Sequence, residues 1–221
     1  MMQPVEQAFL KAILAEPDSD APRLAYANWL SQQGKPRGEF IRLQLRLENL
    51  PHIDPARPGL EQRAHELRLD HQSEWLEPIQ EQTKLPWALL NIWTFKRGFV
   101  DEIGIDPGAF VEHAAKLFAL EPIRVVRLIR PGNRPHLGDR GAVQLAGVPE
   151  LARCRQLQIN DHEIGAAGAR ALVKSPHLQG LAALILDGCL LDGDAQQVFK
   201  DHFGIRLFTR QRDDKNEVLA R

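Results

Sequence analysis

Histidine and carboxylate side chains are close neighbours at three places in the sequence, as metal ligation or general acid–base chemistry requires. The three segments are "HEL" at 65–67, "DHQSE" at 70–74 and "NDHE" at 160–163. None contains two histidines four residues apart, the spacing that places two zinc ligands on one face of a helix. The cysteines, Cys154 and Cys189, lie too far apart in sequence to read as a metal-binding pair. We therefore expect neither a metal site nor a cofactor.

Nucleophilic catalysis has no sequence motif in this chain. The serines at positions 19, 31, 73 and 175 are not part of a G-x-S-x-G turn. The sequence also contains no phosphate-binding loop and no glycine-rich dinucleotide fingerprint. We expect a protein that is not an enzyme.

Arginines cluster between Arg124 and Arg155, and such a cluster could bind phosphates. Against this use, no aromatic residues interleave with the arginines for base stacking, and the net charge of the chain is -1. Nucleic-acid binding is therefore kept only as an alternative function. The cluster consists of Arg124, Arg127, Arg130, Arg134, Arg140, Arg153 and Arg155.

The elements that must position these residues are indicated by an internal repeat. The segment beginning at Gly138 recurs, with changes, 27 residues later at Gly165, and the matches continue in register to Ile159 and Leu186. A fixed period of this length is typical of stacked supersecondary units. Each unit combines a short alternating strand with a helix, and stacking of neighbours creates the core.

The same strand pattern predicts four strands, centred near residues 103, 126, 157 and 184. Asp106 is expected to cap the helix after the first strand, with Phe110, Ala114 and Leu117 as its buried stripe. We expect Gly165 and Gly168 to let a helix pack closely against its strand. The segment "FGIRLF" at 203–208 is a candidate last strand, and residues 209–221 are expected to form a polar cap or a frayed tail.

The first ninety residues follow a helical pattern instead. Proline and glycine residues separate four amphipathic segments, which contain Ile13, Tyr26, Phe40 and Trp75. Tyr26, Trp29 and Phe40 are expected in the helical core, although they could also form a docking surface. We expect Arg37 and Glu39 to pin the turn before the third helix.

Residues 6–44, "EQAFLKAILAEPDSDAPRLAYANWLSQQGKPRGEFIRLQ", resemble the bacterial repeat-companion domain, and "KRGFVDEIGI" at 96–105 resembles the start of the leucine-rich repeats that follow it. One position departs from the family pattern, because Asn28 stands where the family usually has Asp. The resemblance implies a helical module at 1–90 and a ribonuclease-inhibitor-like leucine-rich arc with a C-terminal cap at 91–221. The fold class is then α/β, a solenoid with parallel strands on the concave face and helices on the convex face. In such repeats His162 and Cys189 would hold the turning backbone. The family suggests protein interaction and implies no reaction.

The outward positions of the four strands share one face, because side chains alternate along a strand. We predict that this face binds a protein partner through Val125, Arg127, Ile129, Gln156, Gln158, Asn160, Ile185 and Asp187. Glu102, Gly104, Asp106 and Ala183 are expected to complete it. A further alternative is a structural subunit that docks into an assembly through the helical module.

Composition and hydropathy indicate the cellular compartment in which we expect the protein. Apolar residues form 43% of the chain and charged residues 26%, as in ordinary globular proteins. The sequence has no apolar run long enough to span a membrane and does not begin like a signal peptide. We expect a cytoplasmic protein with no membrane partner.

Overall fold

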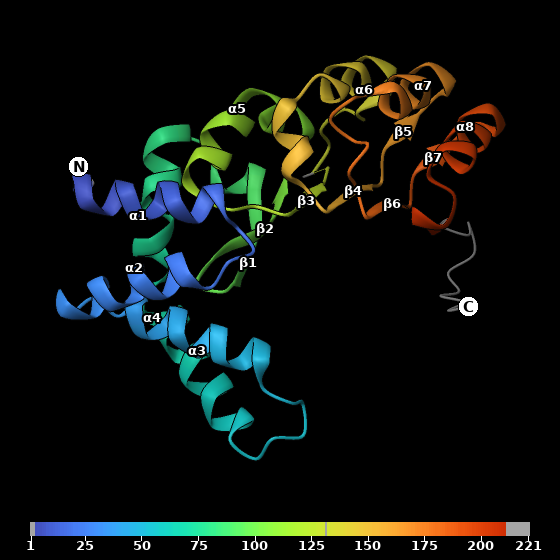
Figure 1. Ribbon diagram of the computed structural model, residues 1–221. Helices are drawn as coiled ribbons and strands as arrows, with labels where there is room; N and C mark the ends of the chain where they lie inside the picture. Colours follow the sequence, from blue (N-terminus) through green and yellow to red (C-terminus); the bar gives the residue numbers. More distant parts are fainter. Residues whose placement is uncertain (1–2, 131, 211–221) are drawn as a thin grey trace. The chain divides into compact units, whose positions relative to one another are not determined.

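The computed structural model describes residues 3–130 and 132–210, without the side chains of residues 87, 91, 92, 205, 209 and 210. The fold is mixed α/β with a mostly parallel sheet (Figure 1). Two compact units divide the chain. The helical unit contains the described residues of Met1–Lys84, Thr94–Asp101 and Lys116–Pro122, and the repeat unit those of Leu85–Trp93, Glu102–Ala115 and Ile123–Arg221. The predicted division of the chain at residue 90 stays a prediction.

The four predicted helices of the helical unit are present. They are α1 (Pro4–Ala15), α2 (Ala21–Gln32), α3 (Arg37–Asn49) and α4 (Arg57–Thr83). Apolar residues of α1, α2 and α3 meet in a core that also includes Phe99, a residue distant in sequence, and Trp75 of α4 stacks on Phe40. Tyr26 and Phe40 are 2% and 1% exposed, so both are core residues as predicted.

A hairpin that the sequence analysis predicted only in part follows the helices. After a short 3-10 turn, η1 (Trp87–Leu89), strands β1 (Leu90–Lys96) and β2 (Phe99–Ile105) lie side by side in the sheet. Strand β2 was predicted and β1 was not. Arg97 and Gly98 form the tip, both with positive φ, as a two-residue hairpin turn requires.

The tip of this hairpin packs into the helical unit. Arg97 donates hydrogen bonds to the carbonyl oxygens of Pro17 and Asp18, at 3.2 and 2.9 Å, and forms an ion pair with Asp20. Gly98 has no room for a side chain, because an added Cβ would overlap Cγ1 of Ile41 and lie 2.9 Å from its Cα. The packing of the hairpin tip therefore requires an arginine at position 97 and a glycine at position 98.

The repeat unit consists of strands that alternate with helices. The sheet continues β1-β2-β3-β4-β6-β8, and β5 pairs with β7 in a separate two-stranded sheet. The elements are α5 (Pro107–Leu120), β3 (Val125–Leu128), α6 (Gly138–Ala146), η2 (Pro149–Arg153), β4 (Gln156–Asn160), β5 (Glu163–Ile164), α7 (Ala166–Lys174), β6 (Ala183–Asp187), β7 (Leu190–Leu191), α8 (Gly193–Phe203), η3 (Gly204–Arg206) and β8 (Leu207–Arg210).

The strand register confirms the predicted strand positions. Leu157 of β4 pairs with Leu184 of β6, and Glu163 of β5 with Leu190 of β7, so these two strand pairs keep the 27-residue offset found in the sequence. Ile103 pairs with Val126, and Val126 with Leu157, all in parallel. The last strand begins at Leu207, later than the predicted segment, and residues 211–221 of the predicted cap lie outside the described part of the chain.

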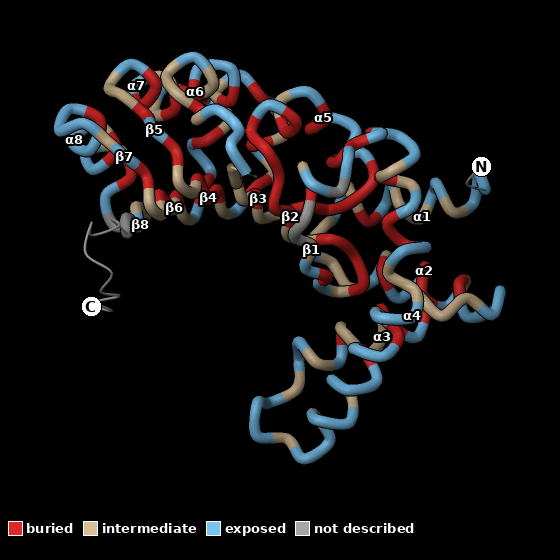
Figure 2. The backbone as a smooth tube through the Cα atoms, turned by 180° about the vertical axis from the view of Figure 1, so that it is seen from behind, coloured by how far each residue is buried: buried red, intermediate tan, exposed pale blue. Residues whose placement is uncertain are grey.

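Helices α6, α7 and α8 lie side by side along one side of these strands (Figures 1 and 2). Gly168 lets α7 approach α6, because an added Cβ would lie 2.7 Å from Oδ1 of Asp139 and 2.9 Å from Cβ of Ala142. The prediction that this glycine serves close packing of a helix on a strand is therefore wrong. Asp139 also accepts hydrogen bonds from the backbone of Gly165 and Gly168, at 2.8 and 3.0 Å, so α6 caps the start of its neighbour.

The predicted start of α5 is confirmed. Oδ1 of Asp106 accepts a hydrogen bond from the backbone N–H of Ala109 at 3.0 Å, and the helix begins at Pro107. Phe110, Ala114 and Leu117 are all buried. In the described part of the chain, none of the helices combines the length and the apolar character needed to cross a membrane.

Candidate functional site

The side of strands β3, β4 and β6 that carries the predicted binding residues is partly exposed. Alternate residues of these strands, such as Val126, Leu157 and Leu184, are at most 1% exposed and face the core. The residues between them form rows across the sheet, because the strands are in register. One row contains Val125, Gln156 and Ala183, the next Arg127, Gln158 and Ile185, and Asn160 pairs with Asp187 in the third.

Strand β4 places three amide side chains on this face. Gln156 and Asn160 are half-buried, and Gln158 is only 8% exposed. The Oδ1 atom of Asn160 is buried without a hydrogen-bond partner among the described residues. The half-buried amides of Gln156 and Asn160 give this face hydrogen-bonding groups.

The charges of the face are largely balanced within the protein. Nε of Arg127 forms an ion pair with Oε1 of Glu102 on the neighbouring strand. The only cation predicted for the face is therefore held by one of its own carboxylates, which weakens its attraction for an anion. The face as a whole is mixed, with amides, a neutralised charge pair, the carboxylate of Asp187 and the half-buried apolar residues Val125, Ile129 and Ile185.

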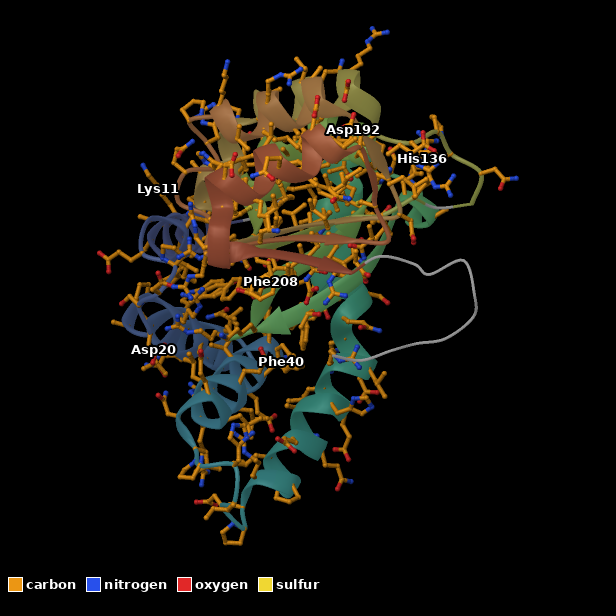
Figure 3. The ribbon with its side chains drawn as sticks, turned by 90° about the vertical axis from the view of Figure 1, so that its right-hand side faces the viewer. Lys11, Asp20, Phe40, His136, Asp192 and Phe208 are labelled. Carbon is orange, nitrogen blue, oxygen red and sulfur yellow. The ribbon has the colours of Figure 1, made fainter. Side chains whose placement is uncertain are left out.

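Phe208 is a residue of this surface that the sequence analysis missed. It pairs with Ile185 in the strand register, and 53% of its surface is exposed (Figure 3). The apolar pair Leu207 and Phe208 was the sequence signal for a further strand with one residue on each face. The strand is short, however, and lies where the repeat pattern decays. Together Ile185 and Phe208 give the face an apolar edge.

One residue expected on the face does not contribute to it. Gly104 is buried but lies in the row of Arg127, as predicted, whereas Asp106 follows the end of β2 and is only 4% exposed. The carboxylate of Asp106 caps α5 and forms an ion pair with Nε of Arg134 at 2.7 Å. The outward placement of Asp106 was wrong because the strand ends at Ile105 and the chain turns into α5.

The arginine cluster is used in part by the fold itself. Arg127 and Arg134 pair with carboxylates, and Arg124 donates to the carbonyl oxygen of Arg153 at 2.8 Å. Burial lowers the pKa of Arg153, as does the nearby charge of Arg124. Several guanidinium groups are thus held in internal contacts, and Arg140 is exposed.

His162 and Cys189 occupy equivalent places in successive repeats and bond to the backbone. Nδ1 of His162 accepts a hydrogen bond from the N–H of Leu137 at 3.0 Å, and the Cys189 thiol donates to the carbonyl oxygen of Ile159 at 3.0 Å. Burial, with a smaller contribution from His136, lowers the pKa of His162 to about 4. Burial raises the pKa of Cys189 to about 11. Within residues 3–130 and 132–210, no three His, Cys, Asp or Glu side chains are grouped to hold a metal ion.

The polar residues of the companion motif serve the helical unit in ways the sequence did not predict. Arg37 forms an ion pair with Glu121 at 3.2 Å, and Glu39 forms one with Arg63 on α4 at 2.7 Å. The prediction that Arg37 and Glu39 pin the turn is therefore wrong. Asn28 accepts a hydrogen bond from Arg42 at 2.9 Å, a contact that its uncharged amide can still make.

The chain matches no protein-family model, no curated protein and no solved structure.

Proposed function

We propose that the repeat unit is a short leucine-rich-repeat solenoid whose exposed strand face binds a protein partner without catalysis. The solenoid is supported by the 27-residue register between strands β4 and β6 and by the repetition of the same offset between β5 and β7. The backbone bonds of His162 and Cys189, at equivalent repeat positions, give further support.

The observation that carries the binding function is the composition of the in-register rows. Amide groups at the centre are flanked by an internally neutralised charge pair on one side and by Ile185 and Phe208 on the other. Such a mixture of apolar and hydrogen-bonding groups, poor in free charge, is typical of protein interfaces. A rigid sheet also lowers the ordering cost of binding, because the side chains are already in place.

The test is site-specific photo-cross-linking in the native host. A photoreactive amino acid replaces Ile185 in one variant and Val143 in a second, because Val143 is 55% exposed on α6, away from the strand face. We expect one protein to be cross-linked from position 185, not from position 143, and lost when Gln158→Arg is added.

Other results would overturn this function. Cross-linking of nucleic acid that disappears steeply as the salt concentration rises would favour the arginine cluster. A protein that is captured in the native host but cross-linked from neither position 185 nor position 143 would place the docking surface elsewhere, with the helical module as the alternative.

A further inference from the structure

The helical unit encloses a small cavity that the proposed function does not use. Its volume is about 100 Å³, and it is lined by side chains of α1, α2 and α4, by the start of α3 with the two residues before it, and by the end of α5. Glu74 and Lys35, whose side chains are 64% and 42% exposed, stand where it opens to solvent. The cavity is therefore both partly enclosed and accessible.

Carboxylates outnumber cations in its lining. The acidic residues of the lining are Glu6, Glu74 and Glu121, and the basic residues are Lys35 and Arg37. Arg37 cannot serve a ligand readily, because it donates to Glu121 at 3.2 Å and to the carbonyl oxygen of Gly98 at 3.3 Å. The lining thus has a surplus of negative charge that an added cation would balance.

The two carboxylates near the opening are only loosely engaged by cations. Glu6 accepts a hydrogen bond from the Tyr26 hydroxyl at 2.8 Å, but its distance to Nζ of Lys35 is 3.7 Å. The nearest basic atom to Glu74 is Nδ1 of His71, also at 3.7 Å. Both distances exceed those of charge-assisted hydrogen bonds, so Glu6 and Glu74 retain capacity to accept from a ligand.

A proline interrupts the backbone hydrogen bonding of α4 beside the cavity. Pro78 lies inside α4 and lines the cavity together with Glu74. Since proline has no N–H, the carbonyl oxygen of Glu74 lacks the donor that a residue four positions later normally provides. This carbonyl is thus open to a donor from outside the helix.

Aromatic rings complete the lining. Tyr26 and Trp75 both border the cavity, and both rings are held in the core by other aromatic side chains. The guanidinium of Arg37 already lies over the ring of Trp75, 5.9 Å from its centroid, so a cation is accommodated beside this ring. Carboxylate acceptors together with aromatic rings in the lining favour a ligand with several N–H donors, a positive charge and a short apolar body.

We propose that this cavity binds a terminal alkylammonium group, from either a small primary amine or a lysine side chain. A cavity of 150 Å³ holds benzene, so about 100 Å³ suits a ligand end of about four or five non-hydrogen atoms. The ammonium group donates to Glu6, to Glu74 and to the freed carbonyl of Glu74, while its methylene groups lie against Tyr26 and Trp75. This site is separate from the strand face, and its test does not depend on the proposed function.

The probe is n-propylammonium, titrated at constant ionic strength into the full chain and followed by backbone amide NMR shifts. We expect saturable shifts of residues around the cavity, with a Kd of roughly millimolar order, as befits so small a ligand. Propan-1-ol and propionate, which match its size without its charge, are expected to give no saturable shifts there.

Three variants define the contacts. Glu6→Gln is expected to weaken binding about tenfold, because it removes a charged acceptor. Glu77→Gln is the matched control, since Glu77 is an exposed carboxylate of α4 outside the lining, and should change Kd less than about twofold. Pro78→Ala restores the missing N–H and should weaken binding about fivefold without lowering the unfolding temperature.

A titration with Nα-acetyl-lysine methylamide distinguishes the two sources of the ammonium group, a small amine and a lysine side chain. Binding of this compound comparable to that of propylammonium identifies a lysine side chain as the natural ligand type, and binding of propylammonium alone identifies a free amine. Equal responses to propylammonium and propan-1-ol, or unchanged binding in folded Glu6→Gln, would overturn the proposal.

Discussion

At the residue scale, His162 makes stability depend on pH. Its buried ring has a pKa of about 4, whereas an unfolded histidine has a pKa near 6.5. The unfolded chain therefore takes up the proton first as the pH falls. We expect the free energy of unfolding to decrease between about pH 6.5 and 4, by up to about 1.4 kcal/mol per pH unit from this group, with no contribution above that window.

Urea unfolding at several pH values checks this expectation. His162→Asn keeps an acceptor for the N–H of Leu137 and removes the titration, so its stability should vary less across the same window. The control His52→Asn, at an exposed loop position, should retain the original pH dependence. An identical pH profile for His162→Asn and the unmodified protein would contradict the assignment.

The buried ion pair between Arg37 and Glu121 is expected to contribute strongly to stability. Burial raises the pKa of Glu121, although the charge of Arg37 lowers it, so this carboxylate depends strongly on its partner. Arg37→Met leaves the acid buried without a cation and should lower the free energy of unfolding at pH 7 by about 3–5 kcal/mol. Glu121→Gln should cost less, because its amide oxygen still accepts from the N–H of Val100. Equal losses in urea unfolding would contradict this order.

Sequence reasoning was successful for residues with local roles and failed for those with distant partners. Asp106 was predicted as a helix cap because a cap is read within a few residues. The partner of Arg37 is 84 positions away, and no local pattern indicates it. The roles of Glu6, Glu74 and Pro78 at the cavity depend in the same way on packing between helices.

At the scale of elements, the β1–β2 hairpin shows why one strand was predicted and the other was not. Strand β2 carries the repeat pattern, with Ile103 and Ile105 on its core side. In β1, Leu90 and Phe95 are both buried although they lie an odd number of residues apart. The strand has buried residues on both faces, so no single alternation marks it in the sequence.

Gly98, at the tip of this hairpin, is expected to be essential for stability. Gly98→Ala should lower the free energy of unfolding by more than about 3 kcal/mol, because φ is +85° and the new methyl group would overlap Ile41. Gly34→Ala is the matched control, since its φ is +66° but no atom lies within 4 Å of the added Cβ. It should cost only about 1 kcal/mol, as measured by urea unfolding. Equal losses would mean that backbone conformation, not close packing, explains both glycines.

At the scale of the whole molecule, the repeat was the most informative feature of the sequence. The 27-residue offset between Leu157 and Leu184 appears unchanged as the strand register, because stacked units must align equivalent residues to form a continuous core. The offset predicted which residues share the strand face. It did not predict Phe208, which follows the decay of the pattern, or the ion pair that neutralises Arg127.

The strand face is expected to bind its partner through apolar and amide contacts more than through charge. A partner bound by amides and by the Ile185–Phe208 edge should dissociate when a charge is buried there, but should respond weakly to salt. Once cross-linking has identified the partner, we expect Ile185→Glu to weaken binding at least about 30-fold in calorimetry, since the new carboxylate would lose water without gaining a cation.

Val143→Glu introduces the same charge at an exposed helix position and should change the affinity less than about threefold. For the unmodified protein, raising the salt concentration from 50 to 200 mM should change Kd by less than about tenfold, whereas a surface that binds several phosphates would lose about a thousandfold or more. A steep salt dependence combined with unchanged binding by Ile185→Glu would move the interaction from the strand face to the exposed arginines, because only a charge-dominated contact combines those two properties.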